Sequence, residues 1–219
     1  MTSPMKRCYL VRHAQTAWND ENRIQGHSDL PLSVLGEQQA ERLGAYFASR
    51  HLQGVFTSAL QRSRQTAQRI AAGNGHRVSP VIEPELAEMH LGSWEGLTPD
   101  EVDARFQGAY QQWRTRPSSV VIPEAEPLEA FRQRVRRALE KILSSVGEGE
   151  YVVVSHGGVI AALLADVLGA DYDVVIRRLR LDNAGITALE YGTGLPHVLW
   201  INSTLHLEPL LHSSRGNWF

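Results

Sequence analysis

The sequence lacks the features that would tie it to a membrane, to an oxidising compartment or to nucleic acid. Cys8 is the single cysteine among 219 residues, so no disulfide can form within the chain. A formal net charge of −2 gives no overall positive field to attract nucleic acid. The longest apolar stretch, residues 159–168, contains Asp166 and is too short to span a bilayer. Residues 1–6 hold no apolar run of signal-peptide length. We therefore expect a cytoplasmic protein with no nucleic-acid and no membrane partner.

Metal-ligand spacing is also missing. Seven of the nine histidines show no paired spacing with carboxylates: His27, His51, His76, His90, His197, His206 and His212. We expect no metal site and no metal or organic cofactor, which argues against the alternative of a metal-dependent hydrolase. Cys8 cannot be the nucleophile of a Cys-x5-Arg phosphatase, because position 14 is alanine.

What the sequence does contain is an alternation of strand and helix patterns. Hydrophobic residues make up 42% of the chain, enough for a large core. Short apolar runs predict strands at residues 8–11, 54–57, 78–82, 151–154, 186–191 and 197–201. Helical spacing predicts helices at residues 32–47, 60–72, 128–146 and 157–168. This order predicts one domain over residues 1–219, an α/β fold: a three-layer α/β/α sandwich with a mostly parallel sheet and an antiparallel edge strand.

Two regions have patterns that are harder to interpret. Residues 84–127 are irregular, and Trp94 within them could line a pocket or pack in a core. The helix expected at 128–146 carries arginines mostly outside its apolar stripe, which favours a solvated face over a nucleic-acid patch. These are Arg132, Arg134, Arg136 and Arg137.

Three of the expected strand-to-helix junctions carry chemically matching residues. The first strand ends at Arg12-His13, the second leads to Ser58 and Arg62, and the strand at 151–154 leads to His156-Gly157. Parallel α/β sheets place their sites where strands end and helices begin. If these strands are neighbours, two arginines and two histidines converge on one crevice.

Such a crevice suits a phosphate group. Arginine binds phosphate oxygens through paired hydrogen bonds and stays charged. The helix beginning at Gly157 presents free backbone N–H groups to an anion. A neutral histidine can attack phosphorus, and neighbouring arginines favour that neutral form because like charges disfavour protonation.

Six ordered segments and a later Leu181-x-Asn183 resemble the histidine phosphatase superfamily, also called phosphoglycerate-mutase-like. They are Leu10-Val11-Arg12-His13-Ala14-Gln15-Thr16 with Asn19, Gln25-Gly26, Leu32-Ser33-x-x-Gly36, Thr57-Ser58-x-Leu60-x-Arg62-x-x-x-Thr66-Ala67, Glu88-x-x-x-Gly92-x-Trp94-Glu95-Gly96 and Val154-Ser155-His156-Gly157-Gly158. Together they cover nearly the whole chain, whereas an Arg-His pair alone would be a weak signal.

The resemblance implies a role for each matching residue. His13 would take the phosphoryl group, and Arg12, Arg62 and His156 would surround its oxygens. Asn19, Gln25 and the Gly157 backbone would add hydrogen bonds. Glu88 would protonate the leaving alkoxide, which is a poor leaving group without a proton. Spacing alone does not select Glu88, since Glu83, Glu85 and Glu95 lie nearby.

Two positions depart from the family pattern. Ala14 follows His13 where the family usually has glycine, and we expect a slight backbone adjustment there. A segment reading Glu124-Ala125-Glu126-Pro127 replaces the family's Gly-Glu-Ser-like segment before the long helix. The second difference affects a loop that we expect to form part of the edge of the substrate site.

The function expected is metal-independent hydrolysis of a small-molecule phosphomonoester through a phosphohistidine. Phosphoglycerate mutase-type transfer is the alternative, disfavoured because the segment between Glu88 and His156 is comparatively short. A silent binding module on the same fold is a second alternative, although every catalytic position is kept. The expected partner is a phosphorylated small molecule, and a homodimer is left open.

Further residues carry open interpretations. His90 could touch substrate. Arg177, Arg178 and Arg180 could attract an acidic substrate or form a solvated basic turn. The tail at residues 212–219 could dock, form an interface or do neither.

Overall fold

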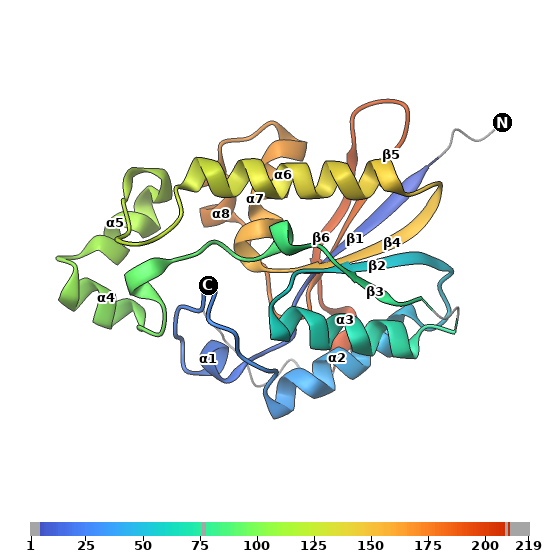
Figure 1. Cartoon of the computed structure of the whole chain (residues 1–219), viewed down its shortest axis with the longest axis horizontal. Coiled ribbons are helices and arrows are strands. Elements are labelled where there is room, and N and C mark those ends of the chain that lie inside the picture. Colours follow the sequence, from blue (N-terminus) through green and yellow to red (C-terminus); the bar gives the residue numbers. More distant parts are fainter. Residues whose placement is uncertain (1–4, 76–77, 209, 211–219) are drawn as a thin grey trace.

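A six-stranded mixed sheet forms the centre of the protein (Figure 1). The computed structural model describes residues 5–75, 78–208 and 210, and the tail at 212–219 lies outside them. The strand order is β3-β2-β4-β1-β5-β6. The strands are β1 Lys6–Arg12, β2 Leu52–Thr57, β3 Pro80–Ile82, β4 Gly149–Ser155, β5 Ile186–Tyr191 and β6 His197–Ser203. β1 to β4 are mutually parallel, β5 is antiparallel to β1, and the edge strand β6 is antiparallel to β5. The predicted mostly parallel sheet with antiparallel pairing at one edge is confirmed.

Helices cover both faces of this sheet, which is why its two central strands carry continuous apolar runs, Cys8–Val11 in β1 and Tyr151–Val154 in β4. Cys8 and Leu10 of β1 face α6 (Leu128–Ser145) and α7 (Gly157–Leu168) in one core. Tyr9 and Val11 of the same strand face α2 (Val34–Phe47) and α3 (Gln61–Gly73) in another. Successive side chains of a strand point to opposite faces, so a strand buried on both sides needs a continuous hydrophobic run.

The irregular middle of the chain folds into short helices that the sequence pattern did not predict. They include α4 (Pro99–Arg105) and α5 (Ala109–Thr115), at the left in Figure 1. A third core joins them to Trp94, which is 2% exposed and lies among Ile24, Leu91, Val102, Tyr110 and Ile122. Trp94 therefore packs in a core.

Other short elements were also missed. α1 (Ala17–Asp20) follows β1, and α8 (Tyr172–Arg178) follows α7. Single 3₁₀ turns occur at Pro84–Leu86, Gly92–Trp94, Pro117–Ser119 and Leu205–Leu207. Helices this short are stabilised mainly by tertiary packing, so local periodicity gives little signal for them.

Capping residues account for the start of α2 and the end of α7. The Ser33 hydroxyl accepts a hydrogen bond from the Gly36 N–H at 3.0 Å and caps α2. α7 ends at Gly169 in the left-handed conformation, φ 58°, where glycine carries no steric penalty. A search of the described residues for a helix long and apolar enough to cross a bilayer found none.

We predict that Gly73→Ala destabilises the fold where α2 and α3 meet. A Cβ at Gly73 would lie 2.7 Å from the backbone carbon and oxygen of Gly44, and backbone cannot move aside as a side-chain tip can. Overpacking of this kind costs about 1–3 kcal/mol. Urea unfolding should show a lower midpoint with an unchanged slope.

Gly147→Ala is the matched control, because a Cβ there meets nothing within 4 Å. Equal midpoints for the two variants would contradict the predicted backbone clash.

Candidate active site

The carboxyl ends of three neighbouring strands bring the predicted polar segments together. Arg12 pairs with Ser155 in the β1–β4 register, and Thr57 pairs with Val154 in the β2–β4 register. The next residues of the three strands, His13, Ser58 and His156, therefore lie side by side. The His13 and His156 rings have centroids 5.2 Å apart. The predicted convergence of two histidines at one edge of the sheet is what the structure shows.

Two buried guanidinium groups border this site, and both are held by backbone carbonyls. Arg12 Nη1 donates to the Leu181 carbonyl at 2.6 Å. Arg62 donates from Nη1 to the Ser28 carbonyl and from Nη2 to the Gly26 carbonyl, both at 2.7 Å. Within the described part of the chain, neither forms an ion pair with a carboxylate. Burial lowers the pKa of Arg62 to about 10, which leaves it charged at neutral pH.

His13 is buried in a defined tautomer. Its Nδ1 lies 2.8 Å from the Ala14 carbonyl oxygen. Because a carbonyl oxygen can only accept, Nδ1 carries the proton and Nε2 keeps a free lone pair. Burial, and then the charges of Arg62 and Arg12, lower the pKa of His13 well below its ordinary value. The ring is therefore neutral and nucleophilic at Nε2.

Ala14, which follows His13, belongs to a buried hydrogen-bond chain. Ala14 is fully buried, and its N–H donates to the Thr66 hydroxyl at 3.0 Å. The Thr66 hydroxyl donates in turn to the Arg62 carbonyl at 2.8 Å. These bonds link the strand that carries His13 to the helix that carries Arg62.

His156 supplies a second neutral imidazole. Its Nε2 lies 2.8 Å from the Ser58 hydroxyl, while Nδ1 is buried and has no partner among the described residues. Burial, and then the charge of Arg62, lower the pKa of His156 well below its ordinary value. When the Ser58 hydroxyl donates to Nε2, the proton of His156 sits on the unpaired Nδ1.

Further donors of the site share this lack of a partner within the described residues: Arg12 Nε, Arg62 Nε and Asn19 Nδ2. A buried donor without an acceptor costs free energy that the oxygens of a bound anion would offset. Gly157 belongs to the same site, since a Cβ placed there would lie 3.7 Å from the Arg12 guanidinium carbon.

The Glu88 side chain lies against the N-terminus of α7, close to the arginines and histidines of the site. One carboxyl oxygen accepts the Gly158 N–H at 3.0 Å, and the other accepts the Met89 N–H at 2.8 Å. The side chain is 6% exposed. The structure therefore brings Glu88 to the helix N-terminus that also holds Gly157.

Arg134 fixes the segment that carries Glu88. Its Nη1 donates to the Glu85 and Ala87 carbonyls and its Nη2 to the Glu88 carbonyl, each at 2.7 Å. Glu126 pairs with the same guanidinium at 2.6 Å. The prediction that Arg134 lies on a solvated face is thus wrong. Glu126, in the segment 124–127 that differs from the family pattern, has a structural role.

Asn19 and Gln25 are buried next to the β1 end of the site. The Thr16 hydroxyl lies 3.1 Å from Asn19 Oδ1 and 2.9 Å from Gln25 Oε1. The Asn183 amide donates to the His13 carbonyl at 3.1 Å and to Asn19 Oδ1 at 3.2 Å. All the sequence-predicted site residues therefore belong to one connected region.

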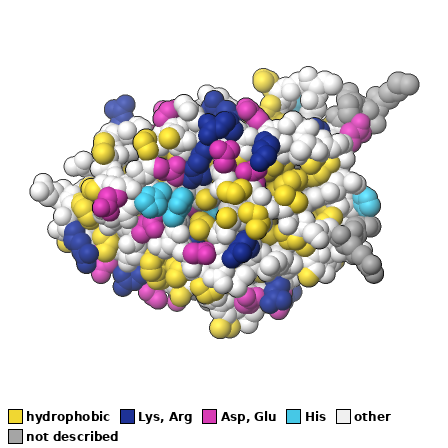
Figure 2. Space-filling view, viewed as in Figure 1, with side chains coloured by type: hydrophobic (Ala, Val, Ile, Leu, Met, Phe, Trp, Pro, Cys, Tyr) yellow, Lys and Arg dark blue, Asp and Glu magenta, His cyan; other side chains and the backbone are white. Residues whose placement is uncertain are grey.

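His27 contacts this region, which its sequence context did not indicate. Its Nε2 donates to the Glu88 carbonyl at 2.8 Å, and its ring centroid lies 5.0 Å from that of His90. Figure 2 shows histidine side chains adjacent on this face. His27 is exposed, as expected, but nothing local in the sequence signals its bond to a distant carbonyl.

The structure is an α/β fold in which two buried arginines and two neutral histidines meet at the carboxyl ends of the strands, an arrangement that suits an anionic ligand. A sequence model of the histidine phosphatase superfamily (branch 1) matches residues 8–204, and the chain belongs to this family of phosphatases and mutases.

Similar proteins of both kinds are known. A probable phosphoglycerate mutase GpmB of Serratia proteamaculans is 36% identical over 196 residues, 85% of this chain and 86% of that protein. YhfR of Bacillus stearothermophilus has a TM-score of 0.85 at 31% identity, over 93% of this chain and all of that one. Mycobacterial glucosyl-3-phosphoglycerate phosphatase has a TM-score of 0.81 at 30% identity, over 90% of this chain and 99% of that one.

We predict that His13 and His156 stay neutral under mildly acidic conditions. Protonation would add charge in a buried site that already holds two guanidinium groups, so the neutral form persists as pH falls. NMR of the imidazole signals from about pH 7.5 to about pH 5.5 should show no titration of either ring. His13→Gln and His156→Gln assign the two signals, and a signal that titrates near the ordinary value of about 6.5 would contradict the prediction.

Proposed function

We propose that this protein is a metal-independent phosphatase that hydrolyses a small-molecule phosphomonoester through a phosphohistidine on His13. The observation that carries the proposal is the neutral, buried His13 beside two guanidinium groups that lack ion-pair partners within the described residues. Its Nε2 is free to form a bond, and the arginines suit the charge of a transferring phosphoryl group.

The first half of the reaction forms the phosphohistidine. His13 Nε2 attacks phosphorus, and the bond from phosphorus to the ester oxygen breaks. The Glu88 carboxyl gives its proton to the departing oxygen, which leaves as an alcohol. Arg12, Arg62 and His156 hold the three peripheral oxygens, and the N–H groups at the start of α7 add donors.

Water completes the cycle. The Glu88 carboxylate takes a proton from a water molecule, and the resulting hydroxide attacks phosphorus. The bond to His13 Nε2 breaks, inorganic phosphate leaves, and His13 returns to its neutral state. Glu88 is protonated again and ready for the next turnover. No step in this sequence needs an oxidant or a further co-reactant.

Phosphoglycerate mutase activity is the second candidate, because it is the activity that the name of the Serratia relative gives. Hydrolysis is favoured by the short stretch between Glu88 and His156, in which α4 and α5 have seven residues each. A mutase must keep its product bound until the phosphoryl group returns. Interconversion of 3- and 2-phosphoglycerate, measured together with phosphate release, distinguishes the two.

We predict phosphate release from p-nitrophenyl phosphate in excess EDTA, and its loss in His13→Ala. Removing the nucleophile should lower kcat by at least about 10³-fold, since the covalent route is closed. His197→Ala is the matched control, because His197 is an exposed residue of β6. Activity that requires an added metal ion, or that persists in His13→Ala, would overturn the proposed mechanism.

For Glu88→Gln we predict a loss that depends on the leaving group. Glycerol 3-phosphate needs a proton on its departing alkoxide, whereas p-nitrophenolate leaves readily without one. The variant should therefore lose about 10²-fold more kcat on the alkyl ester than on the aryl ester. Glu148→Gln, at an exposed glutamate, is the control and should change neither rate. Equal losses on the two esters would exclude Glu88 as the general acid.

A further inference from the structure

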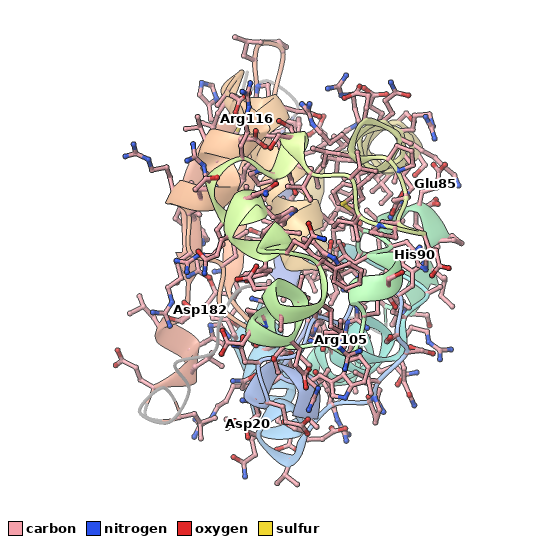
Figure 3. The ribbon with its side chains drawn as sticks, turned by 90° about the vertical axis from the view of Figure 1, so that its left-hand side faces the viewer. Asp20, Glu85, His90, Arg105, Arg116 and Asp182 are labelled. Carbon is pink, nitrogen blue, oxygen red and sulfur yellow. The ribbon has the colours of Figure 1, made fainter. Side chains whose placement is uncertain are left out.

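A pocket of about 260 Å³ lies between α5 and α8, outside the cluster around His13. Tyr110, Trp113 and Pro117 line one side, and residues 176–180 line the other. Figure 3 faces this end of the molecule, with Arg116 beyond the end of α5 and Asp182 just past the second wall. Four of the lining residues are arginines: Arg114, Arg177, Arg178 and Arg180.

Most of this positive charge has no carboxylate partner. Arg180 pairs with Asp182 at 2.7 Å. Arg177 Nε donates to the Asp173 main-chain carbonyl at 2.7 Å, which leaves its charge uncompensated. Within the described part of the chain, Arg114 and Arg178 form no ion pair with a carboxylate. The pocket is therefore cationic in a protein whose net charge is −2.

The Asp173 carboxylate is engaged elsewhere. It accepts the Ser118 N–H at 2.9 Å and the Ser118 hydroxyl at 2.6 Å. Arg116, which does not line the pocket, approaches the same carboxylate at 4.0 Å. Asp173, on α8, thus binds the loop after α5, and the pocket arginines remain available to an external anion.

One wall of this pocket is followed in the chain by residues that contact Arg12 and His13. Arg180 is followed by Leu181, whose carbonyl accepts the hydrogen bond from Arg12. Two residues further on, the Asn183 amide donates to the His13 carbonyl. One short stretch of backbone, residues 180–183, thus borders both the pocket and the site.

The opposite wall carries two aromatic side chains besides Arg114. The Tyr110 and Trp113 rings are stacked, with centroids 5.9 Å apart and planes inclined by 22°. Tyr110 is 8% exposed and packs in the third core with Trp94. A stacked aromatic pair supported from behind provides a surface for a short carbon chain, while the arginines face its charged end.

We infer that this pocket receives an anionic group on the leaving-group side, so that the preferred substrate is a phosphomonoester bearing a second negative charge. A carboxylate or a second phosphate supplies the same chemistry, since arginine binds either through paired hydrogen bonds. The inference rests on the proposed phosphatase function and adds the substrate class to it. Neutral sugar phosphates leave the pocket arginines without partners.

The test compares three esters that share one carbon skeleton. 3-Phosphoglycerate carries a carboxylate, glycerol 1,3-bisphosphate carries a second phosphate, and glycerol 3-phosphate carries neither. Initial rates of phosphate release give kcat and KM for the wild type, for Arg114→Gln/Arg178→Gln and for Arg42→Gln. Arg42 is an exposed residue of α2 and serves as the charge-matched control.

The wild type should prefer at least one anionic ester over glycerol 3-phosphate by about tenfold or more in kcat/KM. The double variant should raise KM for that ester by about 30-fold, with a much smaller change for glycerol 3-phosphate. Arg42→Gln should keep the preference. Which anionic ester is preferred identifies the group that the pocket binds.

Equal kcat/KM for all three esters in the wild type would overturn the inference, and so would a preference that survives in the double variant. Thermal unfolding shows whether the double variant is folded; if it is not, Arg178→Gln alone takes its place. If no ester is hydrolysed, the proposed function fails by itself. In that case, calorimetry measures the affinity of the wild type and of the double variant for the same three compounds. Tighter binding of an anionic ester than of glycerol 3-phosphate, lost in the double variant, would support the inference, and equal binding would overturn it.

Discussion

Burying two guanidinium groups without an ion pair to a carboxylate is the constraint on which the rest of the site depends. Arg12 and Arg62 are held by main-chain carbonyls of distant segments, Leu181 for the first and Gly26 and Ser28 for the second. Carbonyl oxygens orient a guanidinium but do not cancel its charge, and Glu88 attracts both guanidinium groups without forming an ion pair with either. Burying charge without an ion pair is costly, and a bound phosphate dianion would offset that cost.

The same positive charge sets the chemistry of the histidines. A protonated imidazole between two guanidinium groups would add a third buried cation, so His13 and His156 are held neutral. The hydrogen bond from His13 Nδ1 to the Ala14 carbonyl then directs the lone pair to Nε2. In the mechanism that we propose, the same positive charge keeps the His13 nucleophile neutral and attracts an anionic substrate.

The sequence predicted the parts of the structure that have a local signature. Long periodic segments predict the sheet and its four main helices, and the rule that sites lie at strand ends predicts that Arg12, His13, Arg62 and His156 converge. Only the family resemblance selects Glu88, because Glu83, Glu85 and Glu95 lie close to it in the sequence. α4, α5 and α8 were missed, since seven-residue helices depend on packing against distant residues. The solvent-exposed position predicted for Arg134 is wrong for a related reason. Its hydrogen bonds go to the main-chain carbonyls of residues 85, 87 and 88, and the sequence around Arg134 contains no pattern that predicts such distant partners.

The central claim is that His13 carries the phosphoryl group during turnover, and rapid-quench labelling tests it most directly. The enzyme is mixed with an ester that carries a labelled phosphoryl group, stopped in alkali within the first turnover and digested for peptide mass analysis. The account predicts an acid-labile, alkali-stable phosphohistidine on the peptide that contains His13, formed no more slowly than the ester is consumed. Rapid hydrolysis with no labelled histidine, or with the label on another residue, would contradict it.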